Sequence, residues 1–225
     1  MAGRTQGVAA GLSRGRIAAA AVALIDRDGL QRFGVRRLAE ELGVDPMSIY
    51  NHIKGKAALL DAVSEAVLAE VSPDIDATEA DWGVIARRTA HSYRATVQRH
   101  PQVIELLATR PQNSAPALEA LERLTTAMRT AGLPDDIVAD APMILFSFLN
   151  GYLLAVLDST PTPTTAAPEL EPTRYPTMAA LAPRMVAGRG SETEFDRMLD
   201  VVLGGFQDRR AHPGDRPAAR SPRIP

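Results

Sequence analysis

The chain has 225 residues and a mass of 24.1 kDa, enough for one large domain or two small ones. Apolar residues make up 45% and charged residues 23%, which is typical of a soluble globular protein and excludes a wholly disordered chain. Because there is no cysteine, disulfides, thiolate metal sites and cysteine nucleophiles are excluded. Residues 1–11 lack the apolar segment of a secretory signal, so we expect a cytoplasmic protein.

Charge is unevenly distributed along the chain. Residues 1–56 contain nine Lys and Arg against five Asp and Glu, whereas the whole chain has a net charge of −2. A basic front on an acidic body suggests that the front contacts a polyanion. Many solvated surfaces are also locally basic, so charge alone does not decide between the two interpretations.

Apolar residues recur at helical spacing throughout the chain, and no alternating strand of useful length is present. The first third is predicted to form helices over 13–28, 35–42, 46–54 and 56–72. Ser13 is the expected N-cap of the first helix, Asp28-Gly29 ends it, and Gly43 ends the second. Asp45-Pro46 begins the third, with a carboxylate at the N-cap and proline in the first turn.

The predicted helices beyond Pro73 are longer. The first follows a capping box at Thr78–Asp81, and the second is a short helix between Pro101 and Pro111. Two more are predicted over 115–131 and 134–157. The last, over 192–207, follows a second capping box at Ser191–Glu194. The helix over 134–157 is apolar on nearly every side, so we expect it to be buried on nearly every side. Its apolar stretch is at the short limit of a membrane span, and a core helix is the better interpretation.

Two segments are expected to lack regular structure. Residues 158–176 contain five prolines and five threonines, which is typical of a mobile loop. Residues 209–225 are rich in proline and arginine and are expected to be a disordered tail.

Two short helices joined by a tight glycine turn, behind a third helix, have the arrangement of a helix-turn-helix. The second short helix must expose its first turns so that side chains reach base edges in the major groove. Its outward positions are Met47, Ser48, Asn51 and His52, and its inward positions are Ile49 and Ile53. The spacing leaves open whether Tyr50 is a core aromatic or a donor to phosphate.

The segment Phe33–Leu60 resembles the DNA-binding domain of the TetR (tetracycline repressor) family. Its L-A-x-x-L-G-V turn and its Y-x-H-[IV]-K-x-K-x-x-L-L motif keep register together, and the resemblance covers Ser13 to about Val63. The resemblance to the tetracycline repressor's own subgroup is strongest in the second of these motifs. The resemblance implies an all-helical homodimeric regulator, usually a repressor, that releases DNA when a small molecule binds its C-terminal domain.

The resemblance also implies DNA contacts. It places Arg36 near the start of the second helix, Ser48 facing bases, and Tyr50, His52 and Lys56 near phosphates or bases. The full expected DNA-binding set is Arg36, Arg37, Met47, Ser48, Tyr50, Asn51, His52, Lys54 and Lys56. The alternatives are that Arg36 or Arg37 lies on a solvated face and that His52 is merely exposed. Gly34-Val35 and Pro46-Met47 depart from the tetracycline repressor, so its operator is not transferred.

The resemblance implies an organisation for the whole chain. A flexible basic arm over 1–12 precedes the helix-turn-helix domain over 13–60. The helix over 56–72 connects this domain to a ligand-binding and dimerisation domain over 73–208. Two helix-turn-helix domains about 34 Å apart read successive major grooves, so the expected partner is double-stranded, near-palindromic operator DNA. The helices over 137–157 and 192–207 are expected to form the homodimer interface, the alternative being that both are internal core.

A small, mostly apolar effector is the other expected partner, bound among the helices between 81 and 157. The expected lining comprises Tyr93, His100, Leu107, Arg110, Asn113, Phe146 and Asn150. His100 has an alternative role as the cap of a helix end. The segment Leu107–Pro111 resembles the hinge stretch of the tetracycline repressor. The position of its magnesium-binding histidine falls on Leu106 when the stretch is aligned without a gap, whereas a shift by one places a histidine near His100 instead. We therefore predict no metal site and no cofactor.

Two other classes of function are an enzyme and a DNA-binding regulator without a small effector. The sequence has no Walker loop, no G-x-S-x-G and no H-E-x-x-H motif, so we do not expect an enzyme. A DNA-binding regulator without a small effector, either architectural or gated by a protein partner, shares the whole front half of this interpretation. It differs only in whether the C-terminal pocket is occupied.

Overall fold

The computed structural model describes residues 11–71, 75–76, 78–110, 114–157 and 170–211, and the regular elements in these ranges are all helices. The N-terminal group comprises α1 (Arg14–Asp28), η2 (Leu30–Arg32), α2 (Val35–Leu42), α3 (Pro46–His52) and α4 (Gly55–Leu68). The C-terminal group comprises α5 (Trp82–Arg99), η3 (Pro101–Val103), α6 (Ile104–Thr109), α7 (Ala115–Thr130), α8 (Asp135–Leu157), α9 (Pro176–Val186) and α10 (Glu192–Ala211). The predicted all-α fold is confirmed.

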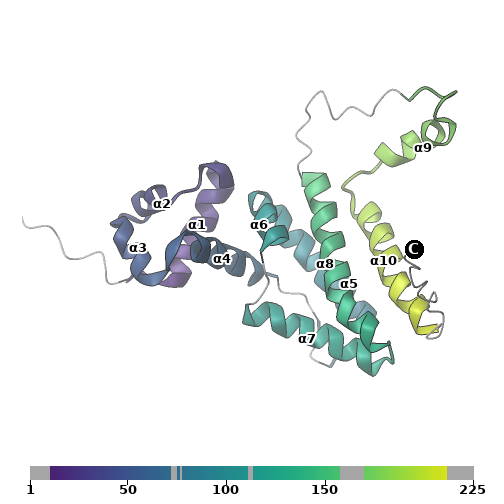
Figure 1. Cartoon of the computed structure of the whole chain (residues 1–225), viewed down its shortest axis with the longest axis horizontal. Helices are drawn as coiled ribbons and strands as arrows, with labels where there is room; N and C mark the ends of the chain where they lie inside the picture. Colours follow the sequence, from purple (N-terminus) through teal and green to yellow (C-terminus); the bar gives the residue numbers. More distant parts are fainter. Residues whose placement is uncertain (1–10, 72–74, 77, 111–113, 158–169, 212–225) are drawn as a thin grey trace, which may run out of the picture.

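The two groups of helices lie side by side along the long axis of the molecule (Figure 1). In the N-terminal group, α1 packs against α4 and α2, and α2 packs against α3. In the C-terminal group, α8 packs against α5, α6, α7 and α10. The helix α9 projects from the body beyond the end of α10 (Figure 1).

The predicted helix boundaries in the N-terminal group are confirmed where a cap defines them. The Ser13 hydroxyl accepts a hydrogen bond from the amide of Arg16 at 3.2 Å, and Gly29, at φ 82°, ends α1. Gly43 ends α2 in the left-handed conformation, with φ 66°. The Asp45 carboxylate accepts from the amide of Met47 at 2.8 Å and begins α3. Local capping chemistry therefore fixes these four helix ends, two of which bound the turn between α2 and α3.

The capping box expected at Thr78–Asp81 differs from the structure. Asp81 itself is the N-cap of α5, and its carboxylate accepts from the amides of Gly83 and Val84. Thr78 instead donates to Asp76 in the preceding turn. Since Asp81 directly precedes the apolar stripe that begins at Trp82, it caps the helix without help from a residue three positions earlier.

The second predicted capping box, before α10, is confirmed in its first half. The Ser191 hydroxyl accepts from the amide of Glu194 at 3.2 Å. The Glu194 carboxylate accepts from the amide of Gly190 at 2.7 Å, one residue before the position that a capping box requires.

Three boundaries in the chain differ from their predictions. The helix α4 ends at Leu68, short of the predicted 72. The helix α9 was not predicted, because the predicted loop extends to residue 176; Pro176 stands in the first turn of α9, where no amide partner is needed. The helix α10 runs to Ala211, so the first three residues of the predicted tail are helical. Residues 1–10, 158–169 and 212–225 of the predicted arm, loop and tail lie outside the described residues.

The prediction that α8 is buried on nearly every side was wrong. Met143 is 76% exposed and Ile144 is 46% exposed, whereas Leu145 and Leu149 are buried. Among the described helices, α8 is the one long and apolar enough to cross a membrane by length and composition alone. The buried residues of α8 pack against α5, α6, α7 and α10. Burial in the helical core therefore explains part of the apolar character of α8.

The N-cap of α3 provides a test of this folding logic. Asp45→Ala removes the acceptor for the amide of Met47, and we expect the free energy of unfolding to fall by about 1 kcal/mol. Urea denaturation followed by circular dichroism measures this change. Ser114→Ala is the matched control, because Ser114 is the N-cap of α7 but its side chain makes no capping hydrogen bond. Equal losses in the two variants would contradict the assignment.

Candidate DNA-binding surface and ligand-binding cavity

The helix α3 is fixed to the N-terminal group by two buried isoleucines. Ile49 and Ile53 are each 1% exposed, and Phe33, Leu38 and Leu59 are buried in the same hydrophobic core. Because these side chains occupy one face of α3, the opposite face lies toward solvent. The two inward positions predicted from spacing, Ile49 and Ile53, are therefore confirmed.

The predicted DNA-contacting side chains lie on the solvent side of this group. Met47 is 66% exposed, although it is a large apolar residue. The other exposed members of the set are Arg36, Arg37, Asn51, His52, Lys54 and Lys56. Ser48 and Tyr50 are partly buried, so Tyr50 is neither a core residue nor freely exposed. These residues come from α2, α3 and the start of α4, which together present a polar and basic surface.

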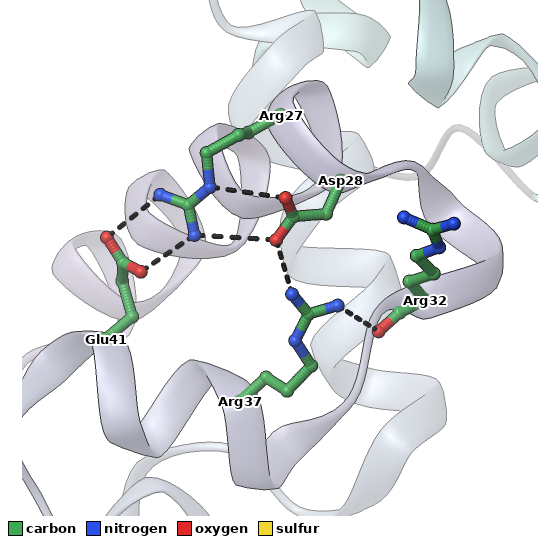
Figure 2. Close-up of polar contacts among 5 residues, drawn as sticks. All are labelled: Arg27, Asp28, Arg32, Arg37 and Glu41. Atoms are coloured by element: carbon green, nitrogen blue, oxygen red, sulfur yellow. Dashed lines mark hydrogen bonds and ion pairs between the residues drawn. The ribbon is translucent and has the colours of Figure 1, made fainter.

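Four charged side chains join the end of α1 to α2 (Figure 2). The Arg27 guanidinium donates two hydrogen bonds to Glu41, at 3.2 and 2.8 Å, and also pairs with Asp28. The Arg37 guanidinium donates to Asp28 at 2.8 Å and to the carbonyl of Arg32 at 3.2 Å. Asp28 therefore lies between two arginines from different helices, and the network fixes the position of α2 on α1.

The network gives Arg37 a role that the sequence did not indicate. Its side chain points toward Asp28 and the α1–α2 turn in Figure 2, so in this conformation it holds the helix-turn-helix together. The hydrogen bonds from Arg27 lower the pKa of Glu41 below its ordinary value, which keeps this carboxylate ionised. Arg36 precedes Arg37 on α2 and is exposed. Its place next to Arg37 in the sequence does not imply that it also positions α2.

An apolar cavity of about 240 Å³ lies between the end of α4 and the helices α5, α7 and α8 of the C-terminal group. Its lining consists of Leu68, Val71, Thr89, Tyr93, Ala117, Ala120, Leu121, Pro142, Met143 and Phe146. Tyr93 and Phe146 were predicted. Ala117 and Ala120 were missed, although two small residues one turn apart on α7, opposite large aromatic residues, are the signal for such a space.

Tyr93, Phe146 and Asn150 form one polar and aromatic group at this cavity. The Tyr93 hydroxyl donates to the Asn150 side-chain oxygen at 2.6 Å, and its ring meets Phe146 edge to face, with centroids 5.4 Å apart. Burial raises the pKa of the Tyr93 phenol, so it stays a neutral donor. Tyr93 and Phe146 thus lie in the cavity lining, whereas Asn150 contacts Tyr93 but is not among the lining residues.

The other residues predicted for the pocket lie elsewhere. His100 contacts Asp26 and Glu70, and Arg110 donates to the carbonyl of Ala57 and pairs with Asp61. Leu107 is buried but is not part of the cavity lining. His100 and Arg110 thus pair with carboxylates of the N-terminal group, and Leu107 is buried in the hydrophobic core. Helical spacing alone does not reveal these partners. Asn113 lies outside the described residues.

A second, larger hollow of about 770 Å³ lies along α7 and is open to solvent. Its walls carry the carboxylates of Glu79, Glu119 and Glu122, and none of its lining residues is aromatic. The smaller cavity is better suited to an apolar ligand, because it is more enclosed and combines apolar walls with a few polar groups.

Exposed apolar side chains on α8 and α10 mark another candidate surface. Met143 and Ile144 on α8 and Met198 and Val201 on α10 are between 39% and 76% exposed. The two helices pack against each other, and the described residues leave these apolar side chains open to solvent. Within the described part of the chain, no group of three or more His, Asp or Glu side chains has the arrangement to hold a metal ion.

An exposed α3 in a helix-turn-helix, together with an apolar cavity in a separate helical group, defines a DNA-binding regulator. Residues 17–63 match the family model described as "Bacterial regulatory proteins, tetR family", and residues 75–210 match "Tetracyclin repressor-like, C-terminal domain". The chain therefore belongs to the TetR family of transcriptional regulators, which are not enzymes.

The relatives agree with this family. The HTH-type transcriptional repressor DrrR1 of Streptomyces coeruleorubidus is 29% identical over 140 residues, 62% of this chain and 52% of that protein. The match thus spans about half of that repressor. The tetracycline repressor protein class C of Escherichia coli is 28% identical over 209 residues, 91% of this chain and 94% of that protein.

A solved structure shows a similar fold in a liganded state. The TetR family protein ActR of Streptomyces coelicolor, in complex with (S)-DNPA, superimposes with a TM-score of 0.76 at 25% identity. The alignment covers 88% of this chain and 98% of that chain. The similarity therefore extends over both groups of helices.

Proposed function

We propose that this protein is a cytoplasmic repressor that binds a near-palindromic operator as a homodimer and is released by a small, mostly apolar effector. One observation carries the proposal: a single chain presents a solvent-facing α3 and encloses an apolar cavity, and α4 reaches both. We further propose that residues 13–60 form the DNA-binding domain and that residues 73–208 bind the effector and dimerise.

The surface of α3 supports specific DNA binding. The side chains of Ser48, Asn51 and His52 have hydrogen-bonding groups for base edges, and Met47 offers an apolar contact for a thymine methyl. Lys54 and Lys56 flank α3 at its C-terminal side and are suited to phosphates, as is Arg36 on α2. We assign Arg37 primarily to positioning α2, because its guanidinium pairs with Asp28.

The exposed faces of α8 and α10 support the homodimer. One helix-turn-helix reads a single major groove, so two copies about 34 Å apart are needed to read successive grooves on one side of the DNA. Large apolar residues are rarely left uncovered in contiguous patches on monomeric proteins. A four-helix arrangement of α8 and α10 with their partner copies covers Ile144, Met198 and Val201.

The cavity supports an apolar, aromatic effector of modest size. Its walls are almost entirely apolar, and the hydroxyl groups of Thr89 and Tyr93 in the lining can orient one polar group of a ligand. Two similar proteins have a small molecule in their name or title. They are the tetracycline repressor protein class C and ActR in complex with (S)-DNPA. We do not extend either ligand to this chain, because Leu106 stands where a magnesium-binding histidine is expected and the ActR identity is low.

The helix α4 connects the two sites. Leu68 at its end lines the cavity, whereas Lys56 at its start lies beside α3. Typical ligand pockets are roughly 300–1,000 Å³, so a cavity of about 240 Å³ must widen for a drug-sized ligand. Widening displaces the end of α4, and the effector then favours the conformation whose α3 helices are wrongly spaced for DNA.

The phosphate contact of Lys56 can be tested on operator DNA that the wild-type protein selects from a random duplex library. Lys56→Ala should weaken binding to all sequences and reduce the slope of log affinity against log salt by about one per half-site. Fluorescence anisotropy across a salt series measures both quantities. Arg184→Ala, an exposed change on α9, is the control and should leave the slope unchanged. An unchanged slope in Lys56→Ala would remove this residue from the phosphate contacts.

The cavity can be tested by a thermal-shift screen with apolar aromatic compounds, including tetracycline with and without magnesium. A compound at about 100 times its Kd should stabilise the protein by roughly 2.7 kcal/mol. Ala117→Phe places a ring inside the cavity and should abolish the shift while DNA binding is retained. Ala139→Phe, an exposed position on α8 outside the cavity, is the control. A panel without any shift would favour a regulator without a small effector.

The proposed dimer surface can be tested by charge insertion. Val201 is 74% exposed on α10, and Val201→Glu would bury a carboxylate in the proposed interface. We expect the mass measured by light scattering to fall from twice 24.1 kDa to 24.1 kDa. Thr193→Glu, also exposed on α10 but near its start, should remain dimeric. A Val201→Glu protein that stays dimeric would place the interface elsewhere.

A further inference from the structure

His100 lies where the two groups of helices meet. It ends α5, and its ring Nδ1 lies 2.7 Å from an Asp26 carboxylate oxygen on α1. Its Nε2 lies 3.1 Å from a Glu70 carboxylate oxygen just beyond α4. The imidazole thus has a carboxylate on each ring nitrogen, and its side chain is only 15% exposed.

This geometry requires a protonated ring. A neutral imidazole has one N–H, so it can donate to only one of the two carboxylates, and its other nitrogen would face an acceptor with a lone pair. The imidazolium donates to both. Each contact is then a charge-assisted hydrogen bond between oppositely charged groups.

The two carboxylates depend on His100 to different degrees. Glu70 also pairs with Arg99 on α5, whose Nη1 lies 3.1 Å away, so it keeps a cationic partner when His100 is neutral. The second oxygen of Asp26 is buried and accepts no hydrogen bond from the described residues. Loss of the proton therefore leaves Asp26, on the DNA-binding side, as the poorly compensated charge.

The charges around His100 are favourable for protonation at neutral pH. Burial of the ring opposes its charge, but the hydrogen bonds and charges of Asp26 and Glu70 outweigh burial and raise the pKa of His100 above its ordinary value. The ionisable groups facing it are Asp26 from α1, Glu70 from the segment after α4, and Arg99 from its own helix; η3 has none.

We propose that His100 is a proton-dependent link between α1 of the DNA-binding group and α5 of the effector-binding group. The link is formed while the ring is protonated, and it opens at its Asp26 contact as the ring loses its proton. Since Tyr93 lies two turns earlier on α5, the link lies on the path from the cavity to α1. The proposal rests on the proposed function only in calling α1 part of a DNA-binding unit.

The sign of the pH dependence follows from the raised pKa. The contribution of the link to stability is fully present below about pH 6.5, the ordinary value for histidine, and is lost as the pH rises through the folded-state value. Alkaline conditions should therefore loosen the attachment of α1, and mildly acidic conditions should preserve it.

The full-length chain and His100→Gln can be compared at about pH 6 and about pH 9, on either side of the expected transition. At the lower pH the variant should unfold roughly 2–4 °C lower, and the amides in the last turn of α1 should exchange with deuterium about five-fold faster. At the higher pH the two proteins should be alike. His91→Gln is the matched control, because His91 pairs with Asp196 between α5 and α10 and does not contact α1.

A second variant and a direct titration complete the test. In an NMR titration, the His100 ring should titrate above about 6.5, and Asp26→Asn should lower that value. His100→Gln should add little destabilisation to Asp26→Asn. A titration at or below the ordinary value, or an exchange difference that is equal at both pH values, would overturn the proposal. None of these readouts uses DNA or an effector, so they stand apart from the tests of the proposed function.

Discussion

The packing of α1 against α4 is the contact on which the rest of the molecule depends. Both helices bury continuous apolar faces, including Ile17, Leu24 and Ile25 on α1 and Leu59 and Val63 on α4. Each such side chain contributes roughly 1.5–3 kcal/mol when it is removed from water. Because α2 and α3 rest on this pair, its rigidity sets the direction of the α3 surface, and because α4 ends at the cavity, the same pair brings the two sites together.

The N-terminal group was predictable because its structure is determined locally. Ser13, Gly43 and Asp45 act on amides and carbonyls within a few residues, so their roles can be deduced from the sequence without tertiary knowledge. The role of Arg37 was not predictable in this way. Its partner Asp28 is nine residues earlier on another helix, and the sequence shows only an arginine near a DNA-binding motif.

The C-terminal group was less predictable because several of its residues serve more than one surface. On α8, Leu145 and Leu149 are buried, Phe146 lines the cavity and Met143 is exposed, so apolar residues occur all around the helix. Periodicity then cannot separate core from cavity or from interface. The same problem affects His100 and Arg110, whose partners are carboxylates on α1 and α4.

These long-range pairs suggest how the two groups of helices communicate. Arg110 at the end of α6 holds the first half of α4 through Asp61 and the carbonyl of Ala57, whereas His100 holds α1 and the segment after α4. Among the described residues, these two polar attachments stand beside the packing of α1 on η3 and of α4 on α5 and α6. Polar pairs are directional and can break or re-form with small movements, whereas close-packed apolar contacts resist sliding. His100 and Arg110 therefore provide contacts between the two groups that can change, whereas the apolar packing of the α1–α4 pair is the more rigid part of the N-terminal group.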